Sequence, residues 1–99
     1  MEIPLVLPSP FGEIFPIVAF STYQNGAWGP VIIEKTLPKV SEKTHALHYG
    51  GTVIEGMKTR KNLNNKMLLF RLHDHHKRMQ QGCDRMALAD VPQELFVEA

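Results

Sequence analysis

Two stretches in the N-terminal half of the chain are rich in β-branched and aromatic residues, and turn residues separate them. They are residues 15–23, FPIVAFSTY, and residues 31–37, VIIEKTL, with QNGAWGP between them. An Asn-Gly pair between two such stretches is a strong hairpin signal, because these residues tolerate the positive φ of a tight turn. The pattern therefore predicts two antiparallel strands joined at Asn25-Gly26.

A second pair of strands is predicted in the middle of the chain. Residues 51–60 and 66–72 form this pair, and the loop NLNN between them contains asparagines that tolerate a positive φ. The connection before them, residues 38–50, contains a proline, a serine and glycine, and leaves room for at most one helical turn. Four strands are therefore expected before any long helix.

The period of the apolar residues changes to that of a helix at about residue 73. Met79, Cys83 and Met86 fall at i, i+4 and i+7, which predicts one amphipathic helix from about His73 to Leu88. The chain thus runs from strands to helices. We expect an α+β fold: a small two-layer domain with an antiparallel sheet of about four or more strands and helices packed on one side.

The C-terminal residues predict a further helix that starts near Pro92, because proline suits a first helical turn. The sequence ends at QELFVEA with no glycine cap, basic last turn or following proline, the signals that normally close a helix. We therefore expect residues 1–99 to be one small domain that is truncated within its last helix.

Composition narrows the class of protein. Of the 99 residues 43% are hydrophobic and 21% charged, as in ordinary globular domains. No apolar run approaches the ~20 residues that span a bilayer, and the start lacks the features of a signal peptide. The single cysteine, Cys83, fits a reducing compartment, so a cytoplasmic location without membrane contact is expected. On a helix it is more typical of a small buried hydrophobe than of a reactive thiol.

Charge is balanced overall but uneven along the chain. The formal net charge of +1 gives no field that would gather nucleic acid, and Phe70 is the only aromatic residue in the basic segment. Nucleic-acid binding is therefore not expected. The segment between residues 56 and 78, however, contains one acid, Asp74, and seven cations: Lys58, Arg60, Lys61, Lys66, Arg71, Lys77 and Arg78. A local anion site is compatible with this segment, and a solvated basic surface is the alternative.

Residues 45–59, HALHYGGTVIEGMKT, carry the side chains that suggest chemistry. A strand here would alternate, with Ile54 and Lys58 on one face and Gly56 between them, where a ligand or another backbone would approach closely. A bulge is the alternative meaning of that glycine. Glu55 falls on the opposite face among apolar residues and needs a cation or backbone donors if it is buried.

Other residues of this stretch give weaker indications. Tyr49 stands on a bend before the strand, where it would line a pocket or a subunit contact, or else pack over the end of the sheet. His45 and His48, and the run HDHH at 73–76, have helical spacing for a metal. They lack cysteine pairs and the HExxH pattern, so no metal site is expected.

These motifs together resemble a known family. HALHYGGTVIEGMKT and the later KMLLFRLHDHHKRMQQGCDRMALADVPQELFVEA are similar to the N-terminal domain of branched-chain amino acid aminotransferases, which are fold type IV pyridoxal-phosphate enzymes. FGEIFPIVAF, YQNGAWG and VIIEKTLPKV extend the resemblance over nearly the whole chain. It implies a small α+β domain before a larger one, pyridoxal 5′-phosphate in the cleft between them, and a homodimer. The implied substrates are branched-chain amino acids and 2-oxoglutarate.

The resemblance also implies roles for individual residues. Arg78, in KRM, matches the arginine that binds the 5′-phosphate of the cofactor. Tyr49 matches a tyrosine that reaches across the dimer interface to the substrate pocket of the neighbouring subunit. Lys58 stands where the family has lysine or arginine at the edge of the active site. Ile54 replaces the usual phenylalanine, and Phe15-Pro16 departs from the family pattern, which leaves the substrate preference open.

No catalytic residue is expected in this chain, because the Schiff-base lysine and the acid that pairs with the pyridine nitrogen belong to the second domain of the family. Arg78, Ile54 and Lys58 are expected to converge on one hollow. The alternative to part of an aminotransferase is a free-standing, noncatalytic remnant or interaction domain that keeps the fold without the activity.

Overall fold

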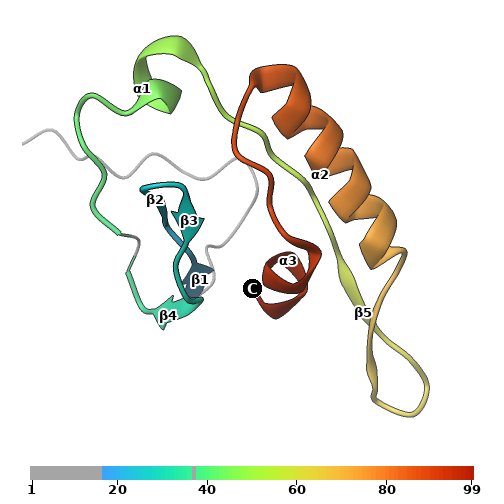
Figure 1. Cartoon of the computed structure of the whole chain (residues 1–99). Helices are drawn as coiled ribbons and strands as arrows, with labels where there is room; N and C mark the ends of the chain where they lie inside the picture. The colour runs from blue at the N-terminus through green and yellow to red at the C-terminus, as the bar shows by residue number, and fades with distance from the viewer. Residues whose placement is uncertain (1–16, 37) are drawn as a thin grey trace, which may run out of the picture.

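The computed structural model describes residues 17–36 and 38–99 (Figure 1). Its strands are β1 (Val18–Phe20), β2 (Tyr23–Gln24), β3 (Ala27–Trp28), β4 (Ile32–Glu34), β5 (Thr59–Lys61) and β6 (Met67–Leu69). Its helices are α1 (His45–Tyr49), α2 (Leu72–Met86) and α3 (Gln93–Glu98). The start of the first predicted strand, with Phe15-Pro16, lies outside the described residues.

The first hairpin is confirmed. β2 pairs antiparallel with β3, and farther from the turn β1 pairs with β4 in the register Phe20↔Ile32. Asn25 and Gly26 both have positive φ, 52° and 81°, as the tight hairpin turn requires. Between the two ladders the hydroxyl of Ser21 donates to the carbonyl oxygen of Gly29 over 2.7 Å, which keeps the two arms together.

The α+β class is confirmed, but the expectation of one sheet with four or more strands is wrong for the described residues. Three sheets of two strands each are present, and β5 pairs only with β6. The predicted strand over residues 51–60 begins at Thr59; residues 51–58 are extended without a strand partner. This extended segment packs against α2, where Val53 lies against Gly82. The two ladders of the first hairpin share the turn at Asn25-Gly26, and the NLNN loop closes the ladder of β5 and β6.

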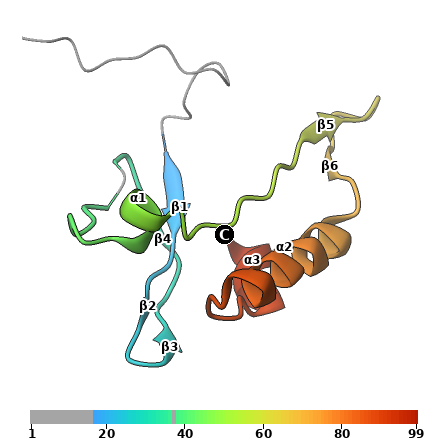
Figure 2. The same cartoon turned by 90° about the horizontal axis from the view of Figure 1, so that it is seen from above.

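The helices form where the sequence predicted them. α1 is the single turn expected between residues 38 and 50, and α2 covers the predicted 73–88 helix to within two residues. Figure 2 shows α2 and α3 on one side of the extended segment. The ring of His76 on α2 lies 5.3 Å from that of Phe96 on α3, measured between centroids. The indole of Trp28 donates to the carbonyl oxygen of Asp90 over 2.6 Å, which joins the first hairpin to the loop between these helices.

Very little of the described chain is buried. Cys83 is the one residue there classed as buried, 3% exposed, which confirms it as a small buried hydrophobe, and burial raises the pKa of its thiol. The radius of gyration is 16.0 Å, against about 13 Å for a compact domain of this length. Large apolar side chains such as Ile54 remain exposed. None of the described helices is long and apolar enough to cross a membrane.

Candidate anion site on helix α2

The extended segment and α2 meet along one face of each. Val53 and Glu55 are partly buried, whereas Ile54 between them is 86% exposed, so the predicted alternation holds even without a strand partner. The contact is close because Gly82 has no side chain. A Cβ on Gly82 would lie 2.8 Å from a methyl carbon of Val53. The face that carries Glu55 is therefore turned toward α2.

Glu55 finds its cation partners on α2. Arg78 donates from Nε to Oε2 of Glu55 over 2.7 Å and from Nη2 to Oε1. Nδ1 of His75 lies 2.6 Å from the same Oε1. Because an ionised carboxylate only accepts hydrogen bonds, Nδ1 of His75 carries the proton here. His75 and Arg78 are three residues apart and so share one face of the helix. The Glu55 side chain is only 5% exposed.

These contacts set the charge state of the cluster formed by Glu55, His75 and Arg78. Hydrogen bonds from Arg78, and then from His75, lower the pKa of Glu55 from its ordinary 4.5 to about 2. The same interaction raises the pKa of Arg78. Next to them Asp74 is paired with Arg71 over 2.6 Å, which lowers the pKa of Asp74. Glu55, Asp74 and Arg78 are therefore all ionised at neutral pH.

The lowered pKa of Glu55 predicts a pH dependence of stability. A carboxyl whose pKa falls on folding stabilises the folded state above its unfolded pKa, and this contribution is lost as the pH falls through the folded value. The free energy of unfolding should therefore decrease between pH 5 and pH 2. In Glu55→Gln the decrease should be smaller and retain the part due to Asp74. Urea unfolding at several pH values measures it, with Glu34→Gln as the exposed control. Equal slopes in Glu55→Gln and the unaltered protein would contradict the prediction.

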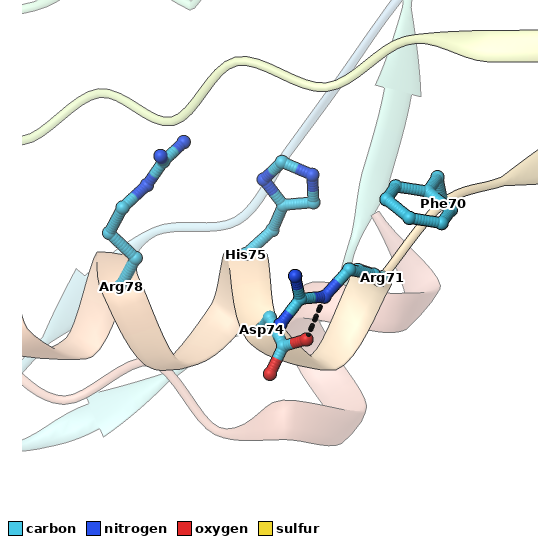
Figure 3. Close-up of a pocket in the computed structure, with 5 residues that line it drawn as sticks. All are labelled: Phe70, Arg71, Asp74, His75 and Arg78. Carbon is cyan, nitrogen blue, oxygen red and sulfur yellow. Dashed lines mark hydrogen bonds and ion pairs between the residues drawn. The ribbon is translucent and has the colours of Figure 1, made fainter.

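A hollow of about 330 Å³ opens beside this cluster, lined by Phe70, Arg71, Asp74, His75 and Arg78. Figure 3 shows His75 and Arg78 projecting from α2 to the same side, while Arg71 pairs with Asp74 at the start of the helix. The Arg78 side chain is 66% exposed. Glu55 occupies its Nε and Nη2, and Nη1 makes no hydrogen bond within the part of the chain that the structure describes. This open edge of the guanidinium fits a phosphate group.

The other predicted site residues lie elsewhere. Lys58 lines a neighbouring hollow with Arg60, Leu68, Leu69 and Phe70, so the side chain of Phe70 borders both hollows. Arg78 and Lys58 therefore do not line the same hollow. Ile54 and Tyr49, 86% and 77% exposed, line neither. Ile54 is on the face of the extended segment opposite to Glu55. The roles assigned to these residues stay predictions.

Two members of the cluster were not evident as partners from the sequence. In the sequence His75 stands out only as part of the run HDHH. Its position three residues before Arg78, which puts both side chains on one helix face, is the feature that could have identified it as a partner. The link from Glu55 to α2 spans 20 to 23 residues, which no local period reveals. Among the described residues no group of three His, Cys, Asp or Glu side chains could hold a metal ion.

Comparison with known proteins gives the family. The branched-chain-amino-acid aminotransferase of Helicobacter pylori is 40% identical over 81 residues, 80% of this chain and 24% of that protein. An aminotransferase of Emericella nidulans is 39% identical over 75 residues, 75% of this chain and 22% of that protein. Branched-chain-amino-acid transaminase 1 of Bacillus subtilis is 32% identical over 92 residues, 90% of this chain and 26% of that protein.

No family model matches the chain. The chain spans about a quarter of the length of the curated relatives that it matches. Their names and the level of identity agree with the resemblance carried by the sequence motifs. The matched segment of this chain therefore belongs to the branched-chain amino acid aminotransferase family.

Proposed function

We propose that this chain is the N-terminal small domain of a pyridoxal-phosphate-dependent aminotransferase. The reaction would transfer an amino group between leucine, isoleucine or valine and 2-oxoglutarate. One observation carries the proposal. Arg78, which matches the phosphate-binding arginine of the family, borders a hollow with one edge of its guanidinium held by Glu55 and the other edge open.

The geometry supports a binding role for Arg78 in particular. A guanidinium offers several N–H donors in a fixed plane and stays charged at any working pH, so it suits phosphate better than an ammonium does. Pyridoxal 5′-phosphate, when bound, would act as the electron sink for amino transfer. Arg78 would hold its phosphate, and the residues of this chain would position the cofactor without performing proton transfer.

The substrate-binding roles follow the resemblance. Lys58 would stand at the edge of the active site, Ile54 would shape the pocket for an apolar side chain, and Tyr49 would reach toward the pocket of a second subunit. All of these require neighbours beyond the described residues. The exposure of Ile54 and Tyr49 is consistent with surfaces that a second domain or a second copy covers. We accordingly propose a larger C-terminal domain carrying the Schiff-base lysine, a homodimer and a cytoplasmic location.

The test is transamination by the protein expressed from its complete open reading frame. With 2-oxoglutarate as acceptor, leucine, isoleucine and valine should each give glutamate, and aspartate as the control donor should give far less. Turnover of aspartate without turnover of the three branched-chain substrates would contradict the proposal. A reading frame that encodes these 99 residues alone would instead favour the noncatalytic alternative.

A further inference from the structure

We propose that Glu55 is a positioning residue for phosphate recognition: it holds Arg78 by the Nε edge so that the opposite edge faces the anion. The inference rests on the proposed function, in which Arg78 binds the cofactor phosphate. It adds a residue on a different segment of the chain, whose carboxylate itself does not touch the cofactor. The observation behind this proposal is that the carboxylate of Glu55 is nearly buried, whereas the guanidinium of Arg78 that it binds is largely exposed.

The hydrogen bonds of Glu55 make it a firm anchor. Oε2 accepts from Nε of Arg78, and Oε1 accepts from both Nη2 of Arg78 and Nδ1 of His75. With both oxygens engaged by α2, rotation of the carboxylate would break at least one bond. Arginine is a long side chain with several rotatable bonds, and binding a ligand normally requires these to be ordered. Glu55 orders them beforehand.

The direction of the open edge follows from the same contacts. Nε and Nη2 form one edge of the planar guanidinium, and Nη1 lies away from that edge. Glu55 approaches from the extended segment, on the face shared with Val53, and Arg78 borders the hollow next to Phe70 and Arg71. Figure 3 shows the Arg78 and His75 side chains extending together toward the chain that passes above α2. For a phosphate in this hollow, Nη1 is therefore the nitrogen of Arg78 that Glu55 leaves free.

An opposing effect has to be weighed. The negative charge of Glu55 also repels a phosphate, and its removal would by itself strengthen anion binding. Solvent screens this repulsion, because the guanidinium between the two anions is 66% exposed. The loss of orientation acts on the contact itself and is not screened. The two effects predict opposite signs for the same substitution, which makes the proposal testable.

The experiment compares Glu55→Gln with the unaltered protein, both expressed from the complete open reading frame. The probes are pyridoxine 5′-phosphate and pyridoxine, which lack the aldehyde and cannot react with lysines. Calorimetry should show about tenfold weaker binding of pyridoxine 5′-phosphate by Glu55→Gln. The reason is that the guanidinium of Arg78 is no longer held in place for its charge-assisted contact with the phosphate. Binding of pyridoxine should be unchanged. Glu34→Gln, at an exposed strand position, should alter neither.

A second readout follows the guanidinium directly. In nitrogen-15 NMR spectra the Nε–H of Arg78 should be protected from solvent exchange in the unaltered protein and unprotected in Glu55→Gln. If Glu55→Gln does not fold, Glu55→Asp keeps the charge but shortens the reach by one methylene group. Its affinity for pyridoxine 5′-phosphate should then be lowered in the same phosphate-specific way.

The outcomes separate this inference from the proposed function. Equal or tighter binding of pyridoxine 5′-phosphate by Glu55→Gln would overturn the positioning role and leave the function of Arg78 intact. Equal weakening of both probes would also overturn it, because it would reveal a general structural effect. Failure of the unaltered protein to bind pyridoxine 5′-phosphate, or unchanged affinity in Arg78→Ala, would overturn the phosphate assignment and this inference with it.

Discussion

Replacing Arg78 by alanine should weaken the binding of pyridoxal 5′-phosphate about a hundredfold, because the charge-assisted contact of the guanidinium with the phosphate is lost. Arg78→Lys keeps the charge but loses the planar fork, so a smaller loss, about tenfold, is expected. Arg71→Ala is the matched control. Arg71 borders the same hollow but is paired with Asp74, and its removal should change the affinity little. Equilibrium titration of the protein from the complete open reading frame measures all three.

Arg78→Ala also leaves the nearly buried carboxylate of Glu55 without its main partner, which by itself destabilises the fold. The double variant Arg78→Ala with Glu55→Gln removes this unpaired charge. Its free energy of unfolding should recover relative to the single variant, while its affinity for the cofactor should not. Recovery of the affinity in the double variant would mean that Arg78 acts through stability and does not contact the phosphate.

Replacing Gly82 by valine should lower the free energy of unfolding by about 2 to 3 kcal/mol, the upper part of the usual range for overpacking a close contact. Even one Cβ here would lie 2.8 Å from a methyl carbon of Val53 and 3.3 Å from the other. The helix and the extended segment must therefore move apart. Urea unfolding at neutral pH measures the loss.

Two further variants show whether that contact is responsible. Gly56→Ala is the matched control, because a Cβ on Gly56 meets nothing within 4 Å, and its stability should hardly change. Val53→Ala removes the two methyl groups that meet Gly82. In the background of Gly82→Val this substitution should restore part of the stability, a coupling that a double-mutant cycle detects. If the losses in free energy of unfolding from Gly82→Val and Val53→Ala simply add in the double variant, the two residues are not coupled and the contact is not responsible.

The parts of the fold that follow from local sequence are those that a turn or a period determines. Asn25-Gly26 sets the first hairpin because positive φ is needed at both positions, and the apolar stripe through Cys83 determines α2. The alternation at Ile54 and Glu55 is likewise a local property of extended backbone. It survives although the expected strand pairing does not form there.

What local sequence did not determine is how these pieces meet. The expectation that Arg78, Ile54 and Lys58 converge on one hollow assumed that α2 covers the same face of the extended segment as the latter two. In the structure α2 contacts the face of Glu55, so Arg78 and Lys58 border separate hollows. The side of a strand that a helix covers depends on packing between elements far apart in sequence. The absence of a side chain at Gly82, which permits that packing, has no periodic signature.

The most direct test of the Arg78 assignment is a crystal structure of the complete protein with pyridoxal 5′-phosphate. We expect Nη1 of Arg78 at about 2.9 Å from a phosphate oxygen, the normal length of such a hydrogen bond. Glu55 should remain bonded to Nε of the same side chain. A phosphate bound away from Arg78, or an Arg78 side chain turned to solvent while the phosphate is held by other residues, would contradict the proposed function.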